Sequence, residues 1–253
     1  MSSLPPNLHL HQHPPPGPSV KLTYPTPSNP NPPSNPPLLT DALRVRHAVF
    51  VEEQGCSADN ELDADDGRSW HWVLYLSSSP SGSHGEGDGQ GHHAPNEREE
   101  GGKVPIGVIR LVPPPHAPHE SLTHPESTSS SSPKYDLDHE PHIKLTRIAV
   151  LPAYRGQGLA RKLVEAALEW AAQHPEEIDA AYDRVLQERT QGQTQGQTQG
   201  KTKRWTGLAL VHAQVAVEGM YAKLGFVTDA GLGRWLEEGI EHVGMWRRVP
   251  VRP

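Results

Sequence analysis

The sequence is poor in the features that mark secreted, membrane-spanning and nucleic-acid-binding proteins. Its single cysteine, Cys56, excludes an intrachain disulfide framework and suits a reducing compartment. No segment approaches the roughly 20 apolar residues of a membrane-spanning helix, and the N-terminus lacks the basic and apolar regions of a signal peptide. The net charge of −7 argues against nonspecific binding of nucleic acid. We therefore expect an intracellular, cytoplasmic protein, with a nuclear location not excluded, that binds neither nucleic acid nor membrane.

Apolar residues are scarce as well. They make up only 34% of the 253 residues, against 27 Pro and 23 Gly. A chain of this composition cannot offset the ordering entropy along its whole length. We expect a disordered Pro-rich tail over residues 1–36, with a possible edge strand at 20–24, which could contact protein partners. One domain should follow over residues 37–253, with flexible low-complexity insertions near 77–103, 113–141 and 174–204.

Two patterns resemble metal ligands without meeting the requirements of a site. His9, His11 and His13 alternate, but no cysteine or carboxylate lies nearby to complete a ligand set, so we interpret them as solvated. The acidic run from Glu61 to Asp66 lacks the bidentate glutamate and the following helix of an EF-hand loop. We therefore predict no metal.

One stretch combines a strand, a glycine-rich turn and a helix. Alternating apolar side chains over residues 143–150 predict a strand, and Pro152 ends it because proline cannot donate to a β-ladder. Apolar residues at helical spacing then run over residues 159–171. The unpaired N–H groups at the start of this helix, together with Gly156 and Gly158, form a site suited to an anion such as a pyrophosphate.

The spacing of residues within this turn shows which of the known phosphate-binding patterns it resembles. A Walker loop ends in Gly-Lys-Ser/Thr and a dinucleotide loop needs a third glycine, and neither is present. Arg155-x-x-Gly158-x-Ala160 instead resembles the acetyl-CoA pyrophosphate loop of the GNAT acetyltransferases.

The order of the predicted elements favours an α/β (α+β) fold with a mixed central β-sheet and helices on both faces. The helix over residues 159–171 joins two strands that we expect to be parallel neighbours, in a right-handed crossover. The other predicted elements are a helix over 38–54, strands over 70–76, 105–112 and 206–214, a helix ending near Gly225, and strands over 226–229 and 242–249.

In this order of elements and in its motifs, the chain resembles the GNAT-superfamily N-acetyltransferases. Tyr221 and the segment Leu224-Gly225-Phe226 add to the loop motif. Residues 46–56 (R-x-x-VFV-x-EQ-x-C) and 237–245 (EEGIEHV-x-M) resemble the ElaA-like branch. The resemblance spans residues 38–248 once the insertions are removed. It implies the GNAT fold and an acyltransferase that moves an acetyl group from acetyl-CoA to a primary amine of a small molecule or peptide, by direct attack on the thioester.

The resemblance also implies a role for each matching residue. Tyr221 would be the general acid for the departing CoA thiolate, although a tyrosine that only packs is the alternative. Acetyl-CoA would be the cosubstrate. The cofactor-binding residues would be Arg155, Gly156, Gln157, Gly158, Leu159 and Ala160 at the pyrophosphate, and Ile148, Ala149 and Val150 along the pantetheine arm.

The acceptor side is less defined. Many GNAT enzymes place a glutamate on the central strand, where this chain has Lys144, Thr146 and Arg147. Deprotonation of the amine would then run either through water or through a residue elsewhere. Arg147 would neutralise either an acidic acceptor or Asp66. The residues that the resemblance places near the acceptor are Glu53, Gln54, Arg147, Gln214 and His242, and the candidates for the general base are Glu53, Gln54, His212, Glu238 and His242.

Two functions of different class follow from these residues. The first is the N-acetyltransferase, favoured by Tyr221 and the intact phosphate loop. The second is a CoA-binding, catalytically weak GNAT-fold protein that acts through protein–protein contacts, and the missing strand glutamate supports it. Fold and cofactor do not fix the acceptor.

Overall fold

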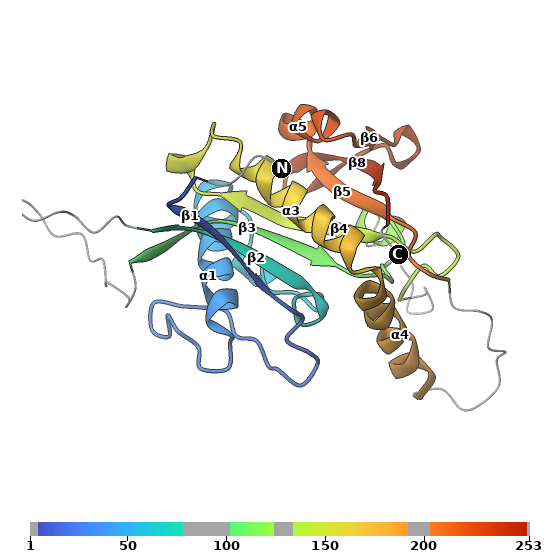
Figure 1. The fold of residues 1–253 in the computed structure, drawn as a ribbon, viewed down its shortest axis with the longest axis horizontal. Coiled ribbons are helices and arrows are strands. Elements are labelled where there is room, and N and C mark those ends of the chain that lie inside the picture. The colour runs from blue at the N-terminus through green and yellow to red at the C-terminus, as the bar shows by residue number, and fades with distance from the viewer. Residues whose placement is uncertain (1–4, 78–101, 124–133, 192–202, 252–253) are drawn as a thin grey trace, which may run out of the picture.

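The fold is built on one eight-stranded mixed β-sheet (Figure 1). The computed structural model describes residues 5–77, 102–123, 134–191 and 203–251. The strands follow the order β1-β2-β3-β4-β5-β8-β6, with β7 also paired to β8. Only β4 and β5 run parallel within this described sheet, as the sequence predicted. The strands are β1 (Leu8–His13), β2 (Trp70–Ser77), β3 (Lys103–Val112), β4 (Ile143–Val150), β5 (Leu208–Gln214), β6 (Val227–Thr228), β7 (Arg234–Glu237) and β8 (Ile240–Arg248).

Helices cover both faces of the sheet, which confirms the predicted fold class (Figure 1). On one face α1 (Pro37–Arg46) buries Ala42 and Val45 against Val73 of β2 and Val108 of β3. On the other face the apolar stripe of α3 (Leu159–Gln173) packs on β3 and β4. The remaining helices are α2 (Glu120–Thr123), α4 (Pro175–Gln191) and α5 (Glu218–Lys223), and a π-helical turn, His47–Glu53, extends α1.

A bulge in β4 opens the sheet at its centre. Arg147 and Ile148 on β4 face the single residue Ile109 on β3, and Arg147 has the left-handed φ of 52°. Pairing of β4 with β5 covers only residues 143–145 of β4 and ends before the bulge. The bulged strand bends away from β5, so residues 148–150 have no strand partner on that side in the described chain.

The N-terminal segment differs from the prediction. The edge strand lies at Leu8–His13 and pairs with β2, whereas residues 20–24 form no strand, so that strand prediction was wrong. Alternation in LHLHQH gives β1 one apolar side, with Leu8 buried and Leu10 packed against the core. This apolar side, and not the Pro-rich composition around it, decides the structure of the segment.

Parts of the predicted flexible insertions are ordered in the described chain. Residues 78–101 lie outside the described part, but residues 113–123 and 134–141 are placed, and the buried His116 ring bonds the carbonyl of His142 at 2.8 Å. In the third insertion α4 extends to Gln191 and buries Ile178 and Tyr182. The QTQG repeat lies outside the described residues. The segment of β7 was predicted to be only a connection. Trp235 is the one buried residue of this strand, so its sequence shows no alternating apolar pattern.

Candidate active site

The turn between β4 and α3 has a backbone suited to an anion. Gly156 and Gly158 have φ of 77° and 72°, in the left-handed region that favours glycine. The first bond of α3 runs from the N–H of Lys162 to the carbonyl of Gly158, at 3.1 Å, and within the described chain the N–H groups of residues 156–161 donate no backbone bond. A Cβ at either glycine would meet no heavy atom within 4 Å. Unpaired donors at a helix N-terminus, facing open space, fit a phosphate group.

A cavity of about 400 Å³ lies beside this turn, in the gap between β4 and β5. It is closed by the segment around Phe50, by α5 and by the hairpin of β7 and β8. Glu53, Gly156, Gln157, Gly158 and Leu159 do not line it. The predicted site residues that do line it are Gln54, Arg147, Ile148, Ala149, Val150, Arg155, Ala160, Gln214, Tyr221 and His242.

Arg155 is held by an acidic partner that the sequence analysis assigned elsewhere. Its Nη1 and Nη2 atoms donate to the two carboxylate oxygens of Glu53 at 2.6 and 2.5 Å, and its Nε donates to the carbonyl of Val150 at 2.9 Å. The hydrogen bonds of this pair lower the pKa of Glu53 and raise that of Arg155. Glu53 was expected near the acceptor. The structure places it against the phosphate turn, outside the cavity.

Tyr221 points its ring into the core beside Phe226, at 5.7 Å between ring centroids. The residue is 5% exposed and lines the cavity, and its phenol has no hydrogen-bond partner in the described chain. Burial raises the pKa of Tyr221 above its ordinary value, so the phenol keeps its proton at neutral pH. A protonated phenol open to a cavity is able to donate a proton there.

The acceptor-side predictions separate into two groups. Gln54 and Gln214 meet, with the amide of Gln214 donating to the side-chain oxygen of Gln54 at 3.0 Å. Arg147 donates from Nη2 to the carbonyl of Asn60 at 2.7 Å and to the carboxylate of Asp63 at 3.2 Å. Its acidic partners within the fold are therefore Asp63 and, at 3.8 Å, Glu61.

Two histidines from neighbouring strands also line the cavity. His242 is buried, bonds the carbonyl of Ile240 through Nδ1 at 2.8 Å, and stacks on Trp235. The Nε2 atom of His212 is sealed from solvent without a partner in the described chain. Burial and then the nearby Lys144 lower the pKa of His212 well below its ordinary value, so this imidazole stays neutral.

A sequence model of the acetyltransferase (GNAT) family matches residues 52–184, more than half of the chain. The chain belongs to the GNAT acetyltransferase family. Among solved structures it is similar to an acyl-CoA N-acyltransferase from Pseudomonas aeruginosa, at 21% identity, 95% and 99% coverage of the two chains and a TM-score of 0.48. It is also similar to ElaA from Escherichia coli, at 17% identity, 95% and 99% coverage and a TM-score of 0.44.

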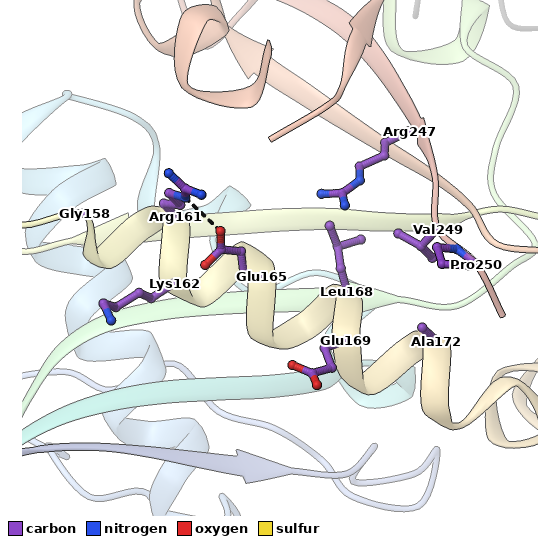
Figure 2. Close-up of a pocket in the computed structure, with 10 residues that line it drawn as sticks. All are labelled: Gly158, Arg161, Lys162, Glu165, Leu168, Glu169, Ala172, Arg247, Val249 and Pro250. Atoms are coloured by element: carbon purple, nitrogen blue, oxygen red, sulfur yellow. Dashed lines mark hydrogen bonds and ion pairs between the residues drawn. The ribbon is translucent and has the colours of Figure 1, made fainter. Parts of the chain in front are cut away.

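A second cavity, of about 670 Å³, lies on the flank of α3 of this GNAT domain. Figure 2 shows Arg161 and Glu165 paired along the helix, while Arg247 of β8 points toward it from the opposite wall. The cavity begins at Gly158 and runs along the helix as far as Ala172. Apart from Gly158, none of the predicted site residues lines this cavity.

Sequence reasoning missed the residues that hold the GNAT site in place. Trp235, which supports the His242 ring, lies in a segment predicted to be only a connection. Asn60 and Glu61 contact Arg147 and were not predicted to do so. The acidic run from Glu61 to Asp66 was considered for calcium, and only its Asp66 was considered as a partner of Arg147. The sequence signal for these contacts was the acidic run itself, whose negative charges need positive partners such as the arginines of neighbouring elements. Among the described residues no group of three or more His, Cys, Asp or Glu is arranged to hold a metal ion, and no helix is long and apolar enough to span a membrane.

Proposed function

We propose that the protein is an acetyl-CoA-dependent N-acetyltransferase of the ElaA-like branch, working in the cell interior on a primary amine of a small molecule or peptide. One observation carries the proposal: the open phosphate-type turn, the unpaired edge of β4 and the protonated phenol of Tyr221 adjoin one cavity. These are the parts that a thioester cosubstrate and an amine need to meet.

Each part has a separate task. The N–H groups of residues 156–160, with Arg155, bind the pyrophosphate, and the free edge of β4 at residues 148–150 pairs with the pantetheine arm. Acetyl-CoA supplies the thioester carbonyl that the amine attacks. A backbone N–H of β4 stabilises the developing oxyanion, and Tyr221 holds a proton for the departing sulfur.

Calorimetric titration with acetyl-CoA tests the turn. We expect binding to the parent protein and no measurable binding to Gly158→Glu, because the new side chain and its charge occupy the phosphate position. Gly233→Glu is the matched control, since Gly233 has a similar φ of 67° and equally open surroundings. It should bind like the parent. Unchanged affinity in Gly158→Glu would remove the assignment of the turn.

A screen of CoA release over primary amines and peptides tests the transfer. We expect release with at least one class of amine. Binding of acetyl-CoA without release for any acceptor would favour the CoA-binding, catalytically weak alternative, in which the N-terminal segment acts through protein contacts.

A further inference from the structure

We propose that His242 is the general base that takes a proton from the ammonium group of the acceptor. The proposal rests on the proposed N-acetyltransferase function. An alkylamine is mostly protonated near neutral pH, and an ammonium nitrogen has no lone pair with which to attack a carbonyl. The β4 positions at the bulge carry Thr146 and Arg147, so β4 supplies no carboxylate for this task.

The hydrogen bond of His242 fixes which ring nitrogen is the base. The carbonyl oxygen of Ile240 can only accept, so the Nδ1 atom of His242 carries the hydrogen in the neutral ring. The lone pair is therefore on Nε2. Nε2 has no partner in the described chain and is not among its sealed, unpaired atoms, while the residue lines the cavity. A proton in the cavity can reach it.

The neighbours of His242 hold its ring in place. Its ring stacks on Trp235 of β7, with centroids 6.2 Å apart and planes 23° apart. Across the sheet it pairs directly with Gln214 of β5, whose side chain therefore shares its face. A ring held by the hydrogen bond to Ile240 and by the stack on Trp235 presents Nε2 in one direction, as a positioned base requires.

The other groups of the cavity are less suited to accept this proton. The lowered pKa of His212 makes it a weak base. The carboxylate of Glu238 is occupied by the N–H of Ser57, at 3.2 Å, and by the side chain of Asn60. Burial and then Glu238 raise the pKa of Cys56, so it remains a thiol.

Four further charged groups and one phenol face the cavity. Glu61 is bonded to Arg46 at 3.0 Å. Arg147 and Arg155 have no lone pair to offer, and Tyr221 is assigned to the sulfur. Glu237 is exposed at the rim and its carboxylate, unlike that of the exposed Glu238, makes no hydrogen bond in the described chain, so the experiment has to separate it from His242.

The proton transfers balance as follows. Nε2 of His242 takes one proton from the ammonium group, which leaves a neutral amine and an imidazolium. The amine nitrogen forms a bond to the acetyl carbon, the carbon–sulfur bond breaks, and Tyr221 gives its proton to the thiolate. The protonated amide nitrogen returns a proton to the Tyr221 phenolate, and the imidazolium releases its proton to solvent. The products are the acetylated amine, CoA thiol and one proton.

The test compares full-length His242→Gln, His212→Gln and Glu237→Gln with the parent in pH profiles of kcat/KM. We expect the parent to lose activity toward acid, because protonation of the base removes its lone pair. His242→Gln should lose that limb and fall roughly 100-fold in kcat, with unchanged acetyl-CoA affinity by calorimetry. The other two variants should keep the limb.

A second acceptor gives a readout that a merely structural role would not change. A fluorinated amine with a low ammonium pKa is already neutral, so the deficit of His242→Gln should shrink toward parity with it. A retained acid limb in His242→Gln, or an equal deficit with both amines, would overturn the base assignment alone. A parent protein that binds acetyl-CoA but acetylates no amine would overturn the proposed function itself.

Discussion

Asp66→Asn should destabilise the fold far more than the same change at the adjacent Asp65. Asp66 has no solvent exposure and lies between Arg46, at 2.7 Å, and Arg110, at 3.0 Å. Asp65 is 41% exposed and pairs with Arg68 at the surface. The two variants remove the same charge one residue apart, so they isolate the effect of burial.

The size of the loss follows from the charges that remain. The cluster balances the guanidinium groups of Arg46, Arg110 and Arg147 against the carboxylates of Glu61, Asp63 and Asp66. Removing one partner from a buried pair costs 3–5 kcal/mol, and about 3 kcal/mol applies here because both arginines of Asp66 keep another carboxylate. That corresponds to roughly 6–12 °C in Tm for a domain of this size. The exposed Asp65 pair should contribute under about 1 kcal/mol.

The effect should depend on pH in a defined direction. Burial alone would raise the pKa of Asp66, but the Arg110 and Arg46 guanidinium groups outweigh it and hold the pKa below its ordinary value. A lowered folded-state pKa stabilises the fold above the unfolded value of about 3.9, and this contribution is lost as pH falls further. Burial lowers the pKa of the neighbouring His71 to about 3, so His71 adds no charge above that pH.

Urea unfolding followed by tryptophan fluorescence at pH 7, 5 and 3.5 measures the difference. The gap between Asp66→Asn and the parent should be constant from pH 7 to 5 and narrower at pH 3.5. Equal stability of the two variants at pH 7, or a gap that does not narrow toward acid, would refute the assignment of a buried, charged Asp66.

Two further predictions concern the site and the sheet. Tyr221→Phe keeps the ring packing and removes the proton donor, so kcat and kcat/KM should fall together by about 10²-fold with acetyl-CoA affinity unchanged, whereas normal turnover in steady-state kinetics would assign the tyrosine to packing. Gly207→Ala should lower the free energy of unfolding in urea by about 3 kcal/mol, because φ is 98° and the new Cβ would overlap the carbonyl oxygen of Val249. Gly219→Ala, in α5 with open surroundings, should instead leave the stability unchanged or raise it slightly. Similar results for both variants would contradict the argument.

The central strands and α3 were predictable because their signals are local. Residues 143–150 and 159–171 carry period-two and helical patterns over enough residues to be recognised. The β4–α3 turn was predictable because a strand, two closely spaced glycines and a helix follow one another directly in the sequence. β7 was not, because four residues with one buried side chain give no pattern. It forms a strand because it pairs with β8, and the residues of β7 alone do not reveal this pairing.

The partners of charged residues could not be predicted at all. Glu53 was placed near the acceptor, yet in the structure it pairs with Arg155, 102 positions further along the chain. Arg147 was assigned to Asp66 or to a substrate and pairs with Asp63. Several carboxylates and several arginines are compatible with such pairings, and the fold chooses among them by distance. Composition and spacing carry no information about that choice.

The charged cluster around Arg147 also stabilises the bulge in β4, next to the point where β4 and β5 separate. Arg147 sits in a left-handed conformation that costs a branched or long residue on the order of 1–3 kcal/mol. Its charge-assisted bond to Asp63, and its bond to the carbonyl of Asn60, offset that cost. Asp63 is in turn fixed by Arg110 of β3, at 2.6 and 2.9 Å. The acidic loop after α1 thus ties the bulge to the neighbouring strand, and the bulge separates β4 from β5, where the cavity of about 400 Å³ lies.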